Sequence, residues 1–206
     1  MTDFAYRLPA IIDTLAEHGW VVVDDFLSSA EVAALRSEGE RRHTAGEFHR
    51  AGVGRANEQH VRDDIRTDDV RWLDPLDRLP AELPYWTCIA ALQAALNREL
   101  YLGLRDGEFH YAHYPAGGFY QRHRDRFRDN TARVISCVFY LNENWQDSEG
   151  GHLRLWLDAE GQGEYRDVAP QAGRLVLFTS ERFWHAVQPA SRPRWSITGW
   201  LRRAEI

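Results

Sequence analysis

The sequence contains no lysine, and all 25 of its basic residues are arginine. Without lysine, the chain can neither form a Schiff base with a carbonyl compound nor supply the lysine of a phosphate-binding loop. Its formal net charge of -6 at pH 7 also argues against a general affinity for nucleic acid, which requires a concentrated positive surface. We therefore expect no nucleic acid among its partners.

Cysteine is scarce as well, because Cys88 and Cys137 are the only two in the chain and each stands in an apolar run. Two buried thiols are therefore favoured over a disulfide, and no Cys-x-x-Cys spacing indicates a zinc site. The sequence also lacks any run approaching the roughly 18 apolar residues of a membrane helix, and residues 1–4 do not begin a signal peptide. These absences predict a cytoplasmic protein with no membrane partner.

The length of 206 residues, with 27% charged and 44% hydrophobic, predicts one compact domain over residues 1–206. In its first half, apolar residues recur at helical spacing in two segments, the spacing Ser28-x-x-Glu31 is that of a capping box at the start of a third helix, and one short apolar run has the composition of a strand. We therefore expect residues 1 to about 105 to form a mainly helical support. The predicted helices are Pro9–His18, Ser29 to about Arg41, and Pro84–Leu100, and the predicted strand is Trp20–Val23.

From about residue 107 to residue 201, short strand-like segments alternate with turn signals rich in glycine, proline and aspartate. Their spacing is typical of a sandwich or jelly roll, so we predict a mainly β fold with flanking helices. The predicted strands are Glu108–Tyr114, Tyr120–Asp125, Arg133–Leu141, His152–Leu157, Tyr165–Val168, Leu175–Thr179, His185–Val187 and Arg194–Leu201.

His123 and Asp125 are two residues apart in one of these predicted strands. Residues i and i+2 of an extended strand project from the same face, about 6.7 Å apart, so both side chains can reach one point. His185 follows sixty residues after Asp125 in a second strand-like segment. Two imidazoles and one carboxylate form the triad that leaves half of an octahedral Fe(II) open, and we predict these three residues as metal ligands.

The other histidines are expected to be packing or surface residues. His110 and His113 are three apart, so in a strand they face opposite sides and cannot chelate together. The remaining set comprises His18, His43, His49, His60, His110, His113 and His152.

The order His-x-Asp, long gap, His, then Arg resembles the Fe(II)- and 2-oxoglutarate-dependent oxygenases. The surrounding motifs resemble the prolyl hydroxylases that act on protein substrates, in particular bacterial members related to the hypoxia-inducible-factor prolyl hydroxylases. This resemblance covers roughly residues 60–201. The motifs are Tyr114-Pro115, Tyr140-Leu141-Asn142, Gly150-Gly151-His152-Leu153-Arg154, His185-Ala186-Val187-Gln188-Pro189 and Arg194.

The resemblance implies a double-stranded β-helix core, a jelly roll of the cupin type, over about residues 107–201. It also implies Fe(II) as the metal, 2-oxoglutarate as the cosubstrate and ascorbate as a candidate reductant. Halogenases of this superfamily carry a small residue in place of the carboxylate ligand, so the presence of Asp125 points to hydroxylation.

Arg194 is the residue expected to anchor the distal carboxylate of 2-oxoglutarate, because a guanidinium grips a carboxylate through two parallel hydrogen bonds. In an extended segment Thr198 and Trp200 share its face and would line the same pocket. Arg192 is a rival for the anchoring role, although it lacks the nine-residue offset from His185. A surface arginine in an ordinary ion pair is the alternative for Arg194.

Tyr140 is expected to donate its hydroxyl to the same carboxylate. By resemblance, Tyr114 borders the cosubstrate and Leu153 forms an apolar wall. Each of these three residues could instead belong to the core, as aromatic residues on half-buried strands usually do.

Residues 42–70 contain few apolar residues and no periodic core pattern, which is typical either of a mobile loop or hairpin at the site entrance or of an ordinary surface connection. The resemblance favours a flexible loop that covers bound substrate. It also implies that Asp68 can pair with Arg133 when substrate is bound. Arginines at positions 122, 124, 126 and 128 could form a basic rim around the first metal ligands, or simply a solvated face.

The implied function is hydroxylation of a proline in a protein substrate, with succinate and carbon dioxide as co-products. Some bacterial relatives act on elongation factor Tu, which makes that protein a candidate partner. Hydroxylation of a free amino acid or other small metabolite is a second hypothesis, and a metal-binding jelly roll without oxygenase activity is a third. The sequence does not determine the oligomeric state.

Overall fold

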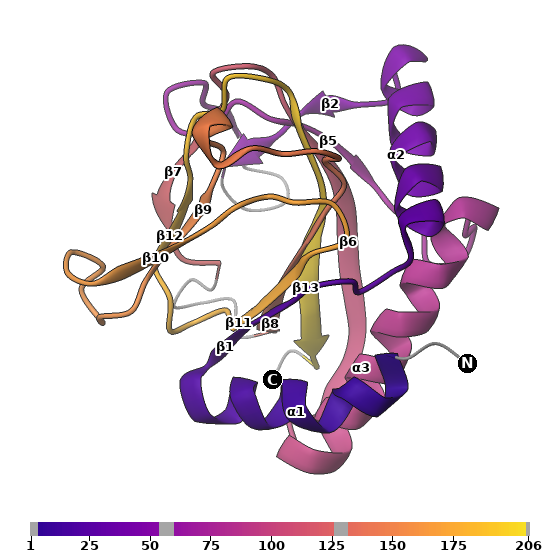
Figure 1. The fold of residues 1–206 in the computed structure, drawn as a ribbon, viewed down its shortest axis with the longest axis vertical. Helices are drawn as coiled ribbons and strands as arrows, with labels where there is room; N and C mark the ends of the chain where they lie inside the picture. Colours follow the sequence, from indigo (N-terminus) through magenta and orange to yellow (C-terminus); the bar gives the residue numbers. More distant parts are fainter. Residues whose placement is uncertain (1–3, 54–59, 126–131, 205–206) are drawn as a thin grey trace.

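The computed structural model describes residues 4–53, 60–125 and 132–204. Within them, two antiparallel sheets lie beside three α-helices, as Figure 1 shows. The helices are α1 (Phe4–His18), α2 (Ser29–Thr44) and α3 (Leu83–Leu100), with short 3-10 turns at Pro80–Glu82 and Asp147–Glu149. None of the helices in these residues is long and apolar enough to cross a membrane.

The larger sheet has seven strands in the order β1-β11-β8-β13-β6-β5-β2, and the smaller has four in the order β10-β9-β12-β7. A separate two-stranded hairpin joins β3 to β4. The strands of the larger sheet are β1 (Trp20–Val23), β2 (His49–Arg50), β5 (Asp69–Trp72), β6 (Leu104–Tyr114), β8 (Arg133–Tyr140), β11 (Leu175–Thr179) and β13 (Arg194–Arg203). The remaining strands are β3 (Gly52–Val53), β4 (His60–Val61), β7 (Tyr120–His123), β9 (Leu153–Trp156), β10 (Tyr165–Val168) and β12 (His185–Val187).

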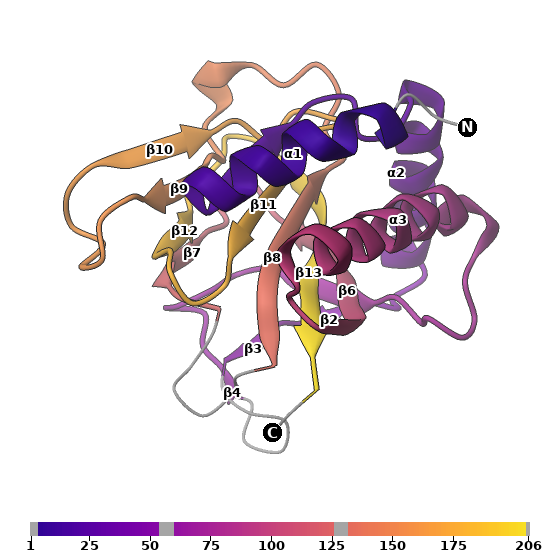
Figure 2. The same cartoon turned by 90° about the horizontal axis from the view of Figure 1, so that it is seen from below.

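The three helices cover the face of the larger sheet that points away from β9 and β12 (Figures 1 and 2). Alternation along β8 explains this arrangement, because successive side chains of a strand point to opposite faces. Cys137 and Phe139 pack into the core shared with the helices, whereas Val138 and Tyr140 pack between the two sheets. The predicted mainly β fold with a jelly-roll core is confirmed.

Several element boundaries differ from the sequence prediction, and two of the differences concern the starts of α1 and β6. The first helix was expected to begin at Pro9 from its apolar spacing; it begins at Phe4, whose ring packs edge-on against Phe26 with centroids 4.9 Å apart. The strand predicted at Glu108–Tyr114 begins at Leu104 instead. Its extra residues include two charged ones, Arg105 and Asp106, so no apolar alternation marks them, and Asp106 pairs across the sheet with Arg202 at 2.8 Å.

The 42–70 segment is neither a plain loop nor a single hairpin in its described part. It contributes β2 and the start of β5 to the edge of the larger sheet, and β3 pairs with β4 as a small hairpin. The short strands are mostly polar, so periodicity could not reveal them.

Gly199 provides a direct test of the strand order. It lies in β13 between Phe109 of β6 and Cys137 of β8, and an added Cβ would overlap the carbonyl oxygen of Glu108. We expect Gly199→Ala to lower the free energy of unfolding by about 1–3 kcal/mol or more, because backbone must move to relieve the overlap. Urea denaturation measures the loss. Gly163→Ala is the control, since its Cβ would meet only the Asp158 side chain at 3.2 Å. Equal stability of the two variants would contradict the packing described.

Candidate active site

Strand pairing brings the three predicted metal ligands together. His185 opens β12 and lies directly opposite His123, the last residue of β7, in the antiparallel register of the smaller sheet. Asp125 lies two residues beyond the end of β7, so the prediction that one strand runs through Asp125 was wrong. The carboxylate of Asp125 nevertheless lies next to both imidazoles. One of them, His123, belongs to the same segment, and the paired strand β12 supplies the other, His185.

The donor atoms of the triad surround one point. Nε2 of His123 lies 3.6 Å from Oδ1 of Asp125, and Nε2 of His185 lies 3.5 Å from Oδ2 of the same carboxylate. All three ligand atoms lie within 4.8 Å of one another. Two imidazole nitrogens and a carboxylate oxygen fit Fe(II), and the remaining coordination positions would be open to other ligands.

Backbone carbonyls orient both imidazoles. Nδ1 of His123 lies 2.7 Å from the Gln121 carbonyl, and Nδ1 of His185 lies 3.2 Å from the Phe183 carbonyl. In the tautomer that donates from Nδ1, each Nε2 offers its lone pair to the centre of the triad. Burial, and then the neighbouring His185, lowers the pKa of His123 to about 4, so this ring is neutral at physiological pH.

Asp125 is held in its ionised form by its neighbours. Burial alone would raise the pKa of this carboxyl group, but His185 and His123 lower it well below the ordinary value. The Oγ of Ser136 donates to Oδ2 of Asp125 at 2.7 Å and lies 2.9 Å from the Oγ of Ser180. Both serines are fully buried, so this short hydrogen-bonded chain fixes the carboxylate.

The sequence analysis gave Ser136 and Ser180 no role. The sequence shows Ser136 as a polar residue in an apolar strand. The position of Ser180 next to Ser136 follows only from the pairing of β11 with β8. A buried hydroxyl between apolar neighbours is the signal that could have identified Ser136.

Arg194 is buried at the start of β13 with only 1% of its surface exposed. Its Nε donates to the Gly151 carbonyl at 2.9 Å, but its Nη2 has no hydrogen-bond partner among the described residues. The hydroxyl of Tyr140 is likewise buried without a partner, and its ring centroid lies 4.9 Å from the guanidinium carbon. A buried N–H and a buried O–H side by side require an acceptor, and a carboxylate would satisfy both.

A single cavity of about 130 Å³ joins the triad to Arg194. Its lining includes most of the residues predicted to bind the cosubstrate, namely Tyr114, Leu153, Thr198, Trp200 and Arg194 itself. Arg192, the rival of Arg194, is not in the lining and pairs with Glu149 at 2.8 Å. The geometry therefore favours Arg194 as the anion-binding residue.

His110 was expected to be a packing residue, but it lines this cavity. It is buried, its Nδ1 has no partner among the described residues, and burial lowers its pKa to about 3. A neutral histidine therefore forms part of the wall. His49 lines the cavity too, which the sequence analysis also did not expect.

Asp68 and Arg133 do not contact each other in this structure, and their pairing in the presence of bound substrate stays a prediction. Asp68 is buried and accepts two hydrogen bonds from Arg66, at 2.7 and 2.5 Å. Arg133 instead pairs with Glu108 at 3.0 Å and stacks on Trp200, its guanidinium carbon 3.4 Å from the ring centroid. Arg66 and Arg133 both line the cavity.

The predicted basic rim is only partly described. Arg122 and Arg124 donate to the carbonyls of Gly161 and Ala159, so both guanidinium groups are already engaged by the neighbouring turn. Positions 126 and 128 lie outside the described residues.

Residues 109–202 match the family described as the 2OG-Fe(II) oxygenase superfamily. The human protein named prolyl hydroxylase EGLN3 is 30% identical over 217 residues, which cover 96% of this chain and 84% of that protein. A solved Pseudomonas putida prolyl-4-hydroxylase shares 44% identity, with a TM-score of 0.88 and coverage of 96% of this chain and 100% of that one.

A Trichoplax adhaerens prolyl hydroxylase, solved with a fragment of the hypoxia-inducible-factor oxygen degradation domain, shares 26% identity. Its TM-score is 0.85, and the match covers 97% of this chain and 90% of that one. Other curated relatives are longer: the chain spans 50% of the length of Egl nine homolog 1 of Mus musculus.

Ser136→Ala tests the hydrogen-bonded chain behind Asp125. Loss of the hydroxyl frees the carboxylate to rotate, so we expect metal affinity to fall about 10–100-fold, the usual effect of removing an outer-shell partner. Titration with Mn(II), followed by calorimetry, measures the change.

Ser136→Thr, which keeps the hydroxyl, should retain most of the affinity, and Ser37→Ala on the exposed surface of α2 should retain all of it. If Ser136→Ala binds the metal as tightly as the unaltered chain, the hydrogen bond has no positioning role.

Proposed function

Because this chain belongs to the 2OG-Fe(II) oxygenase superfamily, among its prolyl hydroxylases, we propose that it hydroxylates a proline residue of a protein substrate. The observation that carries the proposal is one cavity that joins a His-Asp-His triad to a buried arginine lacking a hydrogen-bond partner. The reaction would consume 2-oxoglutarate and dioxygen and release succinate and carbon dioxide, with one oxygen atom entering the proline ring and the other the succinate. We also propose that residues 1–206 act as one oxygenase domain.

His123, Asp125 and His185 would hold the iron through two Nε2 atoms and one carboxylate. When bound, Fe(II) and 2-oxoglutarate supply the oxidising chemistry that acts on an unactivated C–H bond. The protein contributes positioning: the carbonyls of Gln121 and Phe183 fix the rings, and the two buried serines fix the carboxylate.

Arg194 and Tyr140 would bind the distal carboxylate of 2-oxoglutarate, because each offers a buried donor that has no partner among the described residues. Burial raises the pKa of Tyr140, so its hydroxyl stays protonated and able to donate. Tyr114 borders the same space, with its ring centroid 5.2 Å from the guanidinium carbon. Leu153 and Val138 would supply apolar walls that exclude water.

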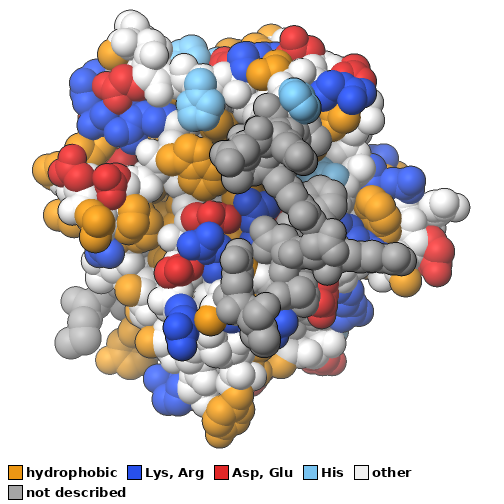
Figure 3. All heavy atoms as spheres, turned by 180° about the vertical axis from the view of Figure 1, so that it is seen from behind, with side chains coloured by type: hydrophobic (Ala, Val, Ile, Leu, Met, Phe, Trp, Pro, Cys, Tyr) orange, Lys and Arg blue, Asp and Glu red, His pale blue; other side chains and the backbone are white. Residues whose placement is uncertain are grey.

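A protein substrate is supported by the cavity's surroundings. The segment that contributes His49, Ala51 and Gly52 to the lining includes β2, the edge strand of the larger sheet, and an extended peptide can pair with such an edge. The Trichoplax adhaerens relative was solved with a peptide fragment of its partner. On the face shown in Figure 3, basic and acidic side chains of the described residues are interspersed rather than gathered in one field.

Elongation factor Tu is our first candidate for the substrate, on the resemblance to bacterial relatives. That partner would place the enzyme in the cytoplasm. The Arg66–Asp68 pair beside the cavity is a candidate substrate contact, and Arg133 another, since both arginines line the cavity next to the triad.

Arg194→Ala should weaken 2-oxoglutarate binding by roughly 3–5 kcal/mol, because it leaves a carboxylate unpaired in a dry pocket. Tyr140→Phe should cost about 1–2 kcal/mol, the loss of one charge-assisted hydrogen bond. Calorimetric titration of the Mn(II)-loaded protein with 2-oxoglutarate measures both. Arg192→Ala is the matched control and should bind normally; a loss confined to Arg192→Ala would transfer the anchoring role to that residue.

Mass spectrometry would identify the substrate. The protein, with Fe(II), 2-oxoglutarate and ascorbate, is incubated with a cell extract and then with purified elongation factor Tu. We expect a mass gain of one oxygen on a proline-containing peptide, with a matching amount of succinate, and neither with His185→Ala. Succinate formed with free amino acids but without any oxidised peptide would favour the small-metabolite hypothesis, and no succinate at all would favour a jelly roll without oxygenase activity.

A further inference from the structure

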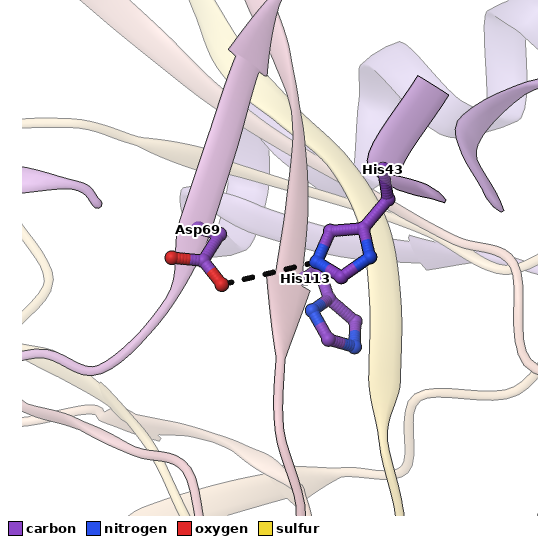
Figure 4. A group of neighbouring side chains, drawn as sticks. All are labelled: His43, Asp69 and His113. Atoms are coloured by element: carbon purple, nitrogen blue, oxygen red, sulfur yellow. Dashed lines mark ion pairs between the residues drawn. The ribbon is translucent and has the colours of Figure 1, made fainter. Parts of the chain in front are cut away.

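A second group of metal-ligating side chains lies on the opposite face of β6 from the triad. It consists of His43 in the last turn of α2, Asp69 at the start of β5 and His113 near the end of β6, as Figure 4 shows. Their ligand atoms lie within 4.8 Å of one another. Ala112 and Tyr114, the neighbours of His113, line the active-site cavity, so the sheet itself separates the two groups.

Secondary structure fixes two of the three ligands. Asp69 and His113 are direct partners in the antiparallel register of β5 and β6, so their side chains project from the same face a few ångströms apart. The end of α2 then carries His43 over this face. Its ring centroid lies 4.3 Å from that of His113, and its Nε2 lies 3.9 Å from Oδ2 of Asp69.

The immediate surroundings leave donor atoms available. Arg50 binds Oδ1 of Asp69 at 3.4 Å, which leaves Oδ2 turned toward His43 (Figure 4). Nδ1 of His113 is buried and has no hydrogen-bond partner among the described residues, although a buried ring nitrogen normally has one. Trp195 supports both imidazoles from behind, with its ring centroid 4.5 Å from that of His113.

We propose that His43, Asp69 and His113 bind a divalent transition-metal ion, with Zn²⁺ as the best match. Two imidazoles and one carboxylate are ligands that Zn²⁺ accepts, and water would complete a tetrahedron because His43 and Asp69 are partly exposed. Zinc bonds of about 2.0–2.2 Å place neighbouring ligand atoms about 3.3 Å apart. The separation of 3.9 Å between His43 and Asp69 closes to that value through a small rotation of the side chains.

The bound ion would connect α2 to the edge of the larger sheet. Asp69 lies opposite Arg50 in the pairing of β5 with β2, and the segment between them contributes Ala51 and Gly52 to the wall of the active-site cavity. Zinc at this point would therefore stabilise the position of the strand that leads into this part of the cavity wall. The site is distinct from the triad and does not depend on the proposed hydroxylase activity.

Zinc stoichiometry tests the proposal without any activity assay. The metal-stripped protein is dialysed against buffered Zn²⁺, and zinc is counted by elemental mass spectrometry. We expect two equivalents per chain for the unaltered protein, one for His43→Ala, and one for the double variant His123→Ala/His185→Ala. His18→Ala, which removes an exposed histidine outside both groups, should keep two. The same zinc count in His43→Ala as in the unaltered protein would overturn the proposal, whether or not the triad binds zinc.

Asp69→Asn covers the case in which His43→Ala does not fold, since it keeps the shape of the side chain. It should weaken the second zinc equivalent at least tenfold. Asp63→Asn is its control, because Asp63 is the other carboxylate paired with Arg50 and lies outside the group. An equal effect of the two substitutions would assign the change to Arg50 and reject zinc binding by Asp69. Crystals soaked in Zn²⁺ should also show an anomalous peak between His43 and His113, and a peak at the triad alone would reject the site.

Discussion

The antiparallel pairing of β12 with β7 is the interaction on which the site depends. It sets His185 directly opposite His123, and the turn after β7 then brings Asp125 to both. The two histidines within this small sheet need little further support, because strand register leaves each side chain few alternative directions. The carbonyls of Gln121 and Phe183 orient the two imidazoles, and Ser136 holds the carboxylate of Asp125.

This arrangement lowers the stability of the folded chain, because it buries polar atoms that have no hydrogen-bond partner among the described residues. Arg194 and Tyr140 are among the buried residues with a polar atom that lacks a partner in the described part of the chain, and their unpaired N–H and O–H lie side by side. Folding alone gains nothing from such groups, since each loses its hydrogen bonds to water. Their presence is understandable when a dicarboxylic acid supplies the missing acceptor. If the proposed function holds, these two donors form a binding site that exists before the cosubstrate binds.

The two faces of β6 show how one strand serves two environments. His110 and Tyr114 face the cavity, whereas His113 faces α2 and joins His43 and Asp69. His110 and His113 do not chelate together, as predicted, but both were expected to be only packing or surface residues. Each histidine contacts residues on other helices or strands, and a local sequence pattern cannot predict such contacts.

Sequence alone determined the class of the fold, most strand positions and the identity of the triad. Apolar alternation reports which face of a strand is buried, and the ligand motifs stand in short local stretches. Tertiary structure decided what depends on contacts between distant segments: the two serines behind Asp125, the pairing of Asp68 with Arg66, the place of His110 in the cavity wall, and the grouping of His43 with Asp69 and His113. These contacts join residues far apart in the chain, and packing of helices on sheets selects among many partners that local composition leaves equally available.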